Sequence, residues 1–278
     1  MPAPLRVATY NLHAGVDGWG RPTDVVKTAV ALDADVLFVQ ESWRSERVDL
    51  AEEIAAATGG TARTYALAQG WRVTGGDGAA SWQSATALLV GNHGLYLDSE
   101  HALRPSAARR LARSAGVERG EWCVGVVTRL AVRSEEVVEL THLAPDLARR
   151  RLVHLSLETG AGPLEAFGLH GAHLSHGSLG QYRELVVDLD ERVAAGSAAL
   201  LGGDLNVWGF LARRVLRGWR HAARGATWPS WRPHSQLDHL FVRGPVEVTG
   251  GGPVAAASSD HRPMAATIVV RPADSPIR

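Results

Sequence analysis

The stretch AALLGGDLN, residues 198–206, places an acidic and an amide side chain directly after a short apolar strand. It closes a unit that begins with a predicted strand over residues 164–174. Between the two strands, apolar side chains recur at helical spacing. They are Leu179, Tyr182, Leu185, Val186, Leu189 and Val193. An acid just past an apolar strand is where open α/β sheets place their functional groups.

The start of the chain repeats this plan. Residues 5–12 alternate apolar and polar side chains, which predicts a half-buried strand. Thr23 or Asp24 is predicted to cap a helix whose apolar positions continue to Leu32. A short apolar strand over residues 36–39 then ends in Gln40-Glu41. Both units therefore present an acid at a strand end.

The remaining sequence predicts antiparallel strands and two long loops, with no linker that divides the 278 residues. We therefore predict one domain over residues 1–278, built as two packed mixed β-sheets flanked by helices. The further strands are expected at 85–90, 122–132, 137–141, 237–242 and 264–270, the loops at 70–81 and 105–120, and a frayed polar tail from residue 271.

Composition limits the classes of function. Lys plus Arg equals Asp plus Glu at 29 each, so any contact with DNA or RNA has to be local. No apolar stretch approaches the ~20 residues of a membrane span and no signal-peptide core follows Met1, so we expect a soluble, cytoplasmic monomer. Cys123 is the only cysteine, which excludes an intrachain disulfide and a Cys-rich zinc site. It is expected to be an apolar strand residue.

Oxygen-bearing side chains stand at four predicted strand ends. They are Asn11, Glu41, Asp204 with Asn206, and Asp260. Carboxylate and amide oxygens are ligands that suit Mg²⁺ or Mn²⁺. Any one of them alone is more often a turn former, so the prediction depends on their order along the chain.

Five short motifs in this order resemble the endonuclease/exonuclease/phosphatase superfamily. They are Thr9-Tyr10-Asn11, Gln40-Glu41, Gly203-Asp204-Leu205-Asn206, Leu237-Asp238-His239 and Ser259-Asp260-His261, and they span nearly the whole chain. The resemblance implies a four-layer αββα sandwich with the active site between the sheets. It also implies divalent-metal-dependent hydrolysis of a phosphoester.

The resemblance also implies a role for each motif residue. Glu41 would be the direct metal ligand with Asn11 beside it, and Asp260 would support the metal through waters. Asp204 and Asn206 would align or activate the attacking water and hold the phosphate, while His261 would be oriented by Asp238. A cation and a protonated imidazole would together stabilise the negative charge that develops on the phosphate and the leaving oxygen. Whether Asp204 or His261 takes the proton of water stays open.

Three histidines lie within seven residues, at 170, 173 and 176. His173 stands where the sphingomyelinase and deoxyribonuclease I branches carry a histidine, which implies phosphate binding or leaving-group protonation; a local loop hydrogen bond is the alternative. A zinc site is disfavoured, because strand alternation would turn His173 away from His170 and His176. We expect these other two to be surface or loop residues.

The roles of the tryptophan and arginine clusters stay open. Trp208, Trp228 and Trp231 either stack on a base or leaving group or pack between loop and sheet. Arg129 and the run 149–151 either contact phosphate or form a solvated face.

The predicted function is a metal-dependent phosphodiesterase, with a nuclease as the first choice. A phospholipid or phosphomonoester hydrolase on the same scaffold is the alternative. A non-catalytic binding module is disfavoured, because all five motifs hold residue types that are competent for chemistry.

Overall fold

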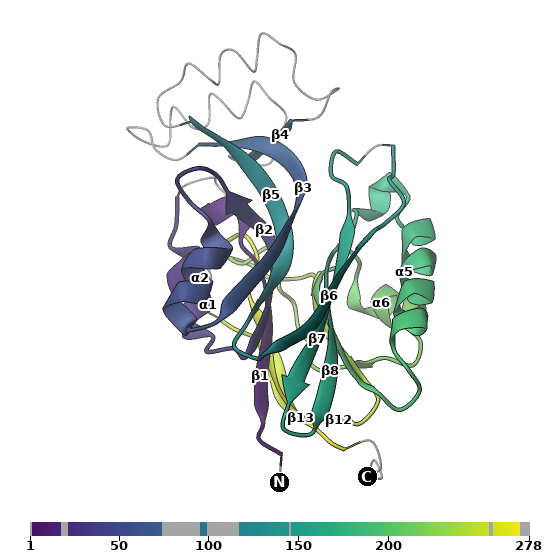
Figure 1. Ribbon diagram of the computed structural model, residues 1–278. Coiled ribbons are helices and arrows are strands. Elements are labelled where there is room, and N and C mark those ends of the chain that lie inside the picture. Colours follow the sequence, from purple (N-terminus) through teal and green to yellow (C-terminus); the bar gives the residue numbers. More distant parts are fainter. Residues whose placement is uncertain are drawn as a thin grey trace.

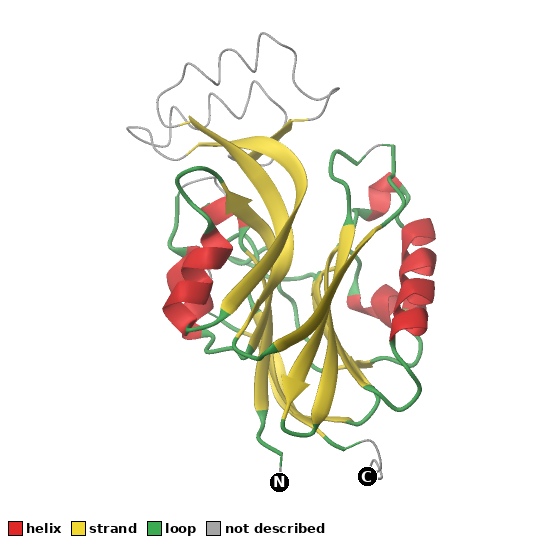
Figure 2. Cartoon of the chain, in the orientation of Figure 1, coloured by secondary structure: helices red, strands yellow, loops and turns green. Residues whose placement is uncertain are grey.

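Two β-sheets pack face to face with helices on the outer face of each (Figures 1 and 2). The computed structural model describes residues 2–17, 22–73, 95–98, 117–144, 146–255 and 258–272. Helices α1 (Val25–Ala31) and α2 (Leu50–Thr58) cover the first sheet, and α5 (Leu179–Arg192) and α6 (Gly209–Val215) cover the second. The predicted four-layer sandwich is confirmed. None of the described helices is long and apolar enough to cross a membrane.

Each sheet is mixed and contains one parallel pair of strands. The first sheet has the order β12-β13-β1-β2-β5-β3-β4, with β1 and β2 parallel. Its strands are β1 (Leu5–Asn11), β2 (Val36–Arg44), β3 (Thr61–Val73), β4 (Leu95–Asp98), β5 (Val117–Thr128), β12 (Val246–Pro253) and β13 (Met264–Val270). The second sheet has the order β10-β11-β9-β8-β7-β6, with β8 and β9 parallel. Its strands are β6 (Val132–Glu139), β7 (Arg151–Thr159), β8 (Gly162–His170), β9 (Ala198–Asp204), β10 (Arg220–His221) and β11 (Asp238–Arg243).

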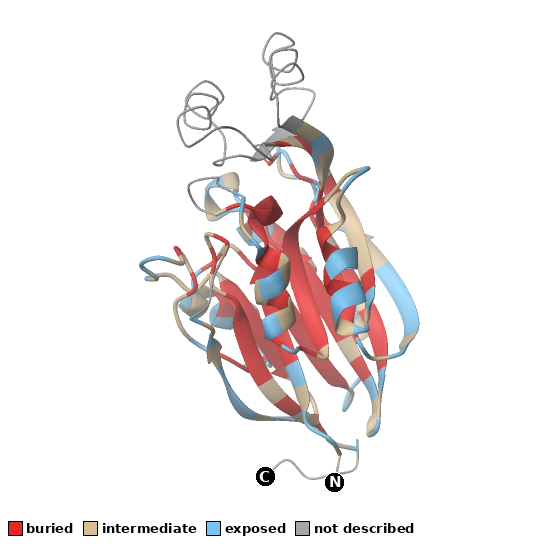
Figure 3. Ribbon diagram, turned by 90° about the vertical axis from the view of Figure 1, so that its left-hand side faces the viewer, coloured by how far each residue is buried: buried red, intermediate tan, exposed pale blue. Residues whose placement is uncertain are grey.

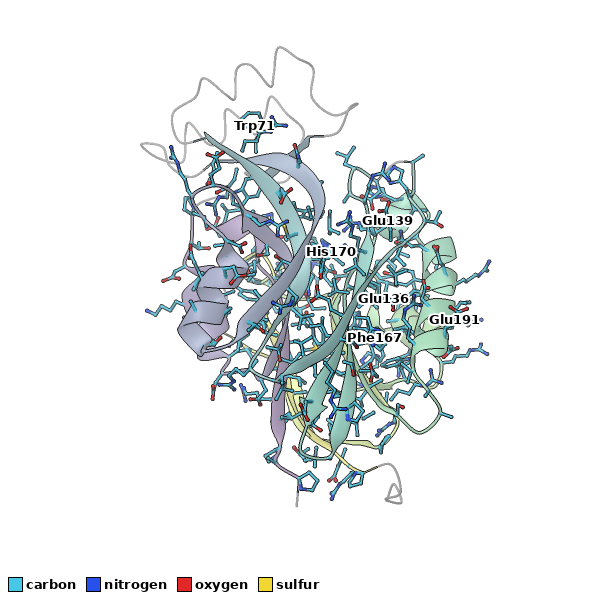
Figure 4. All side chains as sticks on the ribbon, viewed as in Figure 1. Trp71, Glu136, Glu139, Phe167, His170 and Glu191 are labelled. Carbon is cyan, nitrogen blue, oxygen red and sulfur yellow. The ribbon has the colours of Figure 1, made fainter. Side chains whose placement is uncertain are left out.

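Local sequence explains where the helices begin and end. Asp24 accepts a hydrogen bond from the Lys27 backbone N–H at 2.8 Å and so caps α1, one of the two caps predicted. Asp49 caps α2 in the same way, and Gly59 ends that helix in the left-handed conformation at φ 69°. In α5, Leu185 and Leu189 are buried against the sheet, whereas Glu191 points outward (Figure 4).

The core between the sheets depends on glycines that face a large aromatic ring. Phe38 of β2 is fully buried, and its ring lies directly where a Cβ at Gly202 of β9 would be. A Cβ at Gly168 of β8 would approach the same ring to 3.3 Å. The sheets can therefore approach closely only because these two positions carry no side chain. The central strands are buried along most of their length (Figure 3).

Several predicted elements match and others need correction. The expected strand at residues 264–270 and the helix from 25 are confirmed, and Cys123 is buried in β5 as expected. The predicted strand over 164–174 ends earlier, at His170. The predicted loop at 70–81 begins as strand and the one at 105–120 ends as strand, because β3 and β5 stay paired out to Val73 and Val117. The expected strand at 85–90, the rest of both loops and residues 273–278 lie outside the described residues.

The arginines singled out from the sequence do not form a free cationic surface. Arg129 bonds to the Asp33 and Asp35 carboxylates at 2.7 and 2.9 Å. Arg150 is buried rather than solvated, since its guanidinium binds the Asp146 carboxylate at 2.7 Å and lies over the Trp122 ring at 5.3 Å. A buried guanidinium needs such a partner to offset the loss of its hydration.

We expect Gly202→Ala to lower the free energy of unfolding by about 2 kcal/mol, because the new methyl group would displace the Phe38 ring in a close-packed core. Urea denaturation measures this change. Gly160→Ala is the matched control, since nothing lies within 4 Å of its Cβ position, and it should change stability by less than about 0.5 kcal/mol. Equal effects at the two positions would contradict the packing argument.

A buried histidine under α6 gives the fold a pH dependence. His239 is fully buried, and its Nε2 lies 2.9 Å from the Val207 carbonyl oxygen, which it can reach as a donor while the ring stays neutral. Burial lowers the pKa of His239 to about 4, whereas an unfolded histidine titrates near ~6.5. Between pH 4 and pH ~6.5 only the unfolded chain binds a proton at this histidine. The stability that comes from keeping His239 neutral is therefore complete above pH ~6.5, and it is lost as the pH falls toward 4.

Lowering the pH from 7 to 5 should therefore destabilise the native chain by about 2 kcal/mol more than it destabilises His239→Gln, whose amide can still donate to Val207. Urea titrations of both proteins across this range measure the difference. Parallel pH profiles would show that His239 does not carry the effect.

Candidate active site

Strand alternation and register bring three side chains of the second sheet together at one edge of the sandwich. In β9, Gly202 faces Phe38 of the first sheet, so Asp204, two residues further on, faces the same way. His170 ends β8 opposite Asp204, and Asp238 begins β11 on its other side. Asp204, Asp238 and His170 are each no more than 2% exposed.

Glu41 reaches this site because β2 is irregular at that point. Phe38 faces the other sheet, so strict alternation would turn Glu41 toward the helices. The pairing of β2 with β5 shifts between Val39 and Ser42, and Glu41 has the left-handed φ of 50°. Such a backbone costs a non-glycine residue roughly 1–2 kcal/mol, and it is a known feature of functional sites.

Asn11 links the two sheets through its amide group. Its Nδ2 donates to Glu41 Oε1 and to Asp204 Oδ2, each at 3.1 Å. Its Oδ1 accepts the backbone N–H of His13 at 3.0 Å. Asn11 thus lies beside Glu41 as predicted, but it presents donors to the carboxylates, whereas a metal ligand would present its oxygen.

A buried ion pair lies on the other side of Asp204. His261 Nδ1 is 2.8 Å from Asp238 Oδ2, and its Nε2 is 3.7 Å from Asp204 Oδ2. Burial lowers the pKa of His261, but the charges of Asp238, Asp260 and Asp204 outweigh it and hold the pKa well above its usual value. Burial raises the pKa of Asp204 to about 7, against the attraction of His261. The site therefore holds an imidazolium beside a carboxyl group that titrates near neutrality.

Asp260 is held by partners from two other segments. Its Oδ2 accepts a hydrogen bond from Trp228 Nε1 at 3.3 Å, and its Oδ1 lies 3.4 Å from His13 Nδ1. Burial raises the pKa of Asp260, whereas the nearby His13 and His261 lower it. Their combined effect is larger than that of burial, so the pKa lies below its usual value. Trp228 therefore orients an acid of the site, a role not among those considered from the sequence.

His170 belongs to the site, which corrects the expectation of a surface or loop residue. Its Nε2 is 3.2 Å from Asn206 Nδ2 and 3.7 Å from Asp204 Oδ2. Figure 4 shows it between the sheets, and its ring meets the edge of Trp122. Burial lowers the pKa of His170 well below its usual value, with help from Arg150 and His261, so the ring is neutral.

His173 lies outside this cluster. The chain leaves the strand after His170, so the alternation used to orient His173 does not apply. His173 is exposed at the start of a 3-10 turn (Leu174–His176), and its Nδ1 is 2.7 Å from Ser175 Oγ. Among the described residues, no interaction joins it to Asp204 or Glu41. Its predicted role in phosphate binding stays a prediction.

Sequence reasoning missed His13 and His170 as site residues. Alternation along β8 could have found His170, because it continues the inward face of Gly168. His13 follows a strand end without a periodic signal, and its φ of 44° is set by the turn it enters. Of the three histidines weighed as zinc ligands, His170 lies beside Asn206, whereas the rings of His173 and His176 lie 6.0 Å apart.

A divalent cation fits the site at Glu41. Its Oε2 is buried and has no hydrogen-bond partner, which a bound cation would supply. By spacing alone, Asp204, Asp238 and His261 could also hold an ion, with ligand atoms within 4.8 Å. His261 Nδ1, however, already lies 2.8 Å from one Asp238 oxygen, Oδ2. The remaining Asp238 oxygen, Oδ1, is buried without a partner as Glu41 Oε2 is, and the role of Glu41 as the direct metal ligand stays a prediction.

Comparison with known proteins identifies the family. The sequence profile of the Endonuclease/Exonuclease/phosphatase family matches residues 8–261. The chain belongs to this family, whose members hydrolyse phosphoester bonds. No curated protein matches the sequence closely enough to serve as a relative.

Solved structures share the fold at low sequence identity. An endonuclease/exonuclease/phosphatase from Beutenbergia cavernae is 19% identical with a TM-score of 0.61, over 96% of this chain and 72% of that one. A mannosyl-6-phosphatase of Bacteroides thetaiotaomicron is 15% identical with a TM-score of 0.61, over 95% and 99%. Truncated TDP2 of Caenorhabditis elegans is 16% identical with a TM-score of 0.54, over 96% and 98%. These likenesses establish the fold alone.

We expect Glu41→Gln to raise the free energy of unfolding by about 1 kcal/mol in EDTA, because it removes a buried, half-satisfied negative charge beside Asp204. Mg²⁺ should raise the melting temperature of the native chain and leave that of the variant unchanged. Thermal denaturation measures both, with Glu53→Gln on the exposed face of α2 as the control. A variant that is less stable in EDTA and still responds to Mg²⁺ would exclude this metal site.

Proposed function

We propose that the protein is a divalent-metal-dependent phosphodiesterase that cleaves its substrate by in-line attack of water, and that it is a nuclease. The observation that supports this most directly is the unpartnered, buried Glu41 Oε2 beside the Asp204 carboxyl group and the His261 imidazolium. A carboxylate without a partner, a proton acceptor and a cation are the groups that phosphodiester hydrolysis requires.

In this proposal Glu41 and Asp260 hold Mg²⁺ or Mn²⁺, and Asn11 holds Glu41 in place. The bound ion would neutralise charge on the non-bridging phosphate oxygens. Trp228 and His13 orient the Asp260 carboxylate toward this task. Asn206 donates to His170 or to the Gly171 carbonyl, and its Nδ2 is placed to turn to a phosphate oxygen instead.

The pKa shifts favour a different proton transfer for each of two residues. Asp204, whose pKa burial raises to about 7, is the group that can accept the proton of the attacking water near neutral pH. His261 is already protonated, since neighbouring carboxylates raise its pKa, so it cannot serve as that base. Its Nε2–H is free to stabilise the phosphate and to protonate the leaving oxygen as the P–O bond breaks. Asp238 keeps the ring in this orientation through Nδ1.

A phosphomonoester or phospholipid hydrolase would use the same centre. The structural likeness to a mannosyl-6-phosphatase is the observation that favours a monoester. The choice between these substrates lies in the surface around the centre rather than in the reacting groups.

We expect Mg²⁺- or Mn²⁺-dependent hydrolysis of bis-p-nitrophenyl phosphate and of single-stranded DNA or RNA, abolished by EDTA. Glu41→Gln and His261→Ala should each lower kcat by at least about 100-fold, because each removes a group that meets charge in the transition state. Steady-state assays that include plasmid, sphingomyelin and an inositol phosphate measure the preference, with Glu53→Gln as the control.

Activity confined to the lipid or the monoester would support the proposed mechanism of hydrolysis but would contradict the proposed nucleic-acid substrate. Hydrolysis that survives EDTA and both substitutions would exclude the proposed centre altogether.

A further inference from the structure

The chain has no net charge, yet its arginines are distributed unevenly. Residues 205–237, which follow Asp204 and lead to Asp238, contain six arginines and neither Asp nor Glu. All six are exposed: Arg213, Arg214, Arg217, Arg220, Arg224 and Arg232. Within the residues that the structure describes, no carboxylate pairs with any of them. This segment therefore carries an excess of positive charge, which the overall composition conceals.

Two exposed aromatic rings stand at the start of the same segment. Trp208 and Phe210 are 49% and 61% exposed, and their rings are nearly parallel at 11° with centroids 6.1 Å apart. Burial of aromatic rings of this size is favourable, so their exposure to solvent costs free energy. The pair offers flat, accessible faces to a ligand.

The segment connects the rings and the arginines to the candidate active site. Trp208 is two residues beyond Asn206 and immediately precedes α6. Arg213 and Arg214 follow Phe210 by about one helical turn along α6, which lies in the outer layer of the second sheet (Figure 1). Arg213 and Arg224 both act on His221 of β10, so two parts of the segment share one positive field.

We propose that Trp208, Phe210 and the arginines Arg213, Arg214 and Arg217 form a binding surface for single-stranded nucleic acid. Unpaired bases stack on the two rings, and phosphates of the same strand pair with the guanidinium groups of Arg213 and Arg214 in α6 and of Arg217 just after it. The inference rests on the proposed function and deepens it, since the strand bound here is the substrate whose phosphodiester enters the site beside Asn206.

The chemistry of the surface favours a single strand over other polyanions. Aromatic faces bind any exposed base, which a duplex keeps within its stack. Arginine pairs with phosphate in a bidentate geometry. A bilayer would need a continuous apolar face, whereas α6 has only seven residues, and two of its last three are arginines.

Fluorescence anisotropy of labelled oligo(dT) and oligo(rU) in EDTA tests the proposal without turnover. Trp208→Ala and Phe210→Ala should each weaken binding by about 5- to 100-fold. The triple variant R213Q/R214Q/R217Q should weaken it further and reduce the slope of log affinity against log salt by about 2, since each lost phosphate contact contributes ~0.7. Val187→Ala on α5 and Arg133→Gln on β6 are matched exposed controls and should bind as the native chain does.

Affinity and salt slope that are unchanged in all these variants would overturn the proposal. So would a native chain that ignores both oligonucleotides and binds vesicles containing phosphatidylserine through Trp208 and Phe210. Binding is measured in EDTA, so this result does not depend on whether the protein has nuclease activity. Conversely, a failure to bind oligonucleotides would not contradict hydrolysis of the small diester.

Discussion

The amide group of Asn11, which donates to a carboxylate of each sheet, is the contact around which the site is built. It holds Glu41 and Asp204 close together in a space almost closed to water. Buried carboxylates at this density are stable only with cations or donors nearby. His261 supplies one positive charge, while Glu41 Oε2 and Asp238 Oδ1 are buried without hydrogen-bond partners. The charge balance of the site thus supports the metal centre proposed above.

The rest of the fold serves to bring these groups into register. Glycines at 168 and 202 let Phe38 fit between the sheets, so the strand ends that carry His170 and Asp204 approach β1 and β2. The backbone is strained at two residues of the candidate site, with left-handed φ values of 50° at Glu41 and 51° at Asn206. Such strain persists because the surrounding core determines the conformation, and it fixes side chains that regular strands would direct elsewhere.

Local patterns predicted the two strand, helix, strand units and the acids at their ends, because alternation and capping are local properties. The register that sets Asp238 and His170 on either side of Asp204 is not local, and neither is the bulge that turns Glu41 inward. Alternation also failed at His173, since the chain leaves the strand three residues earlier. Trp228, which could be read as a stacking residue, donates to Asp260 through a contact 32 residues away in sequence. The charge balance of the whole sequence likewise hid the arginines concentrated in residues 205–237.

The claim that Glu41 is the anchor of a metal centre is tested most directly by anomalous diffraction from crystals of the native chain soaked in Mn²⁺. We predict an anomalous difference peak within coordination distance of Glu41 Oε2, about 2.0–2.2 Å, and its loss in Glu41→Gln crystals. A peak confined to Asp204, Asp238 and His261, or none at all, would contradict the charge argument on which this account depends.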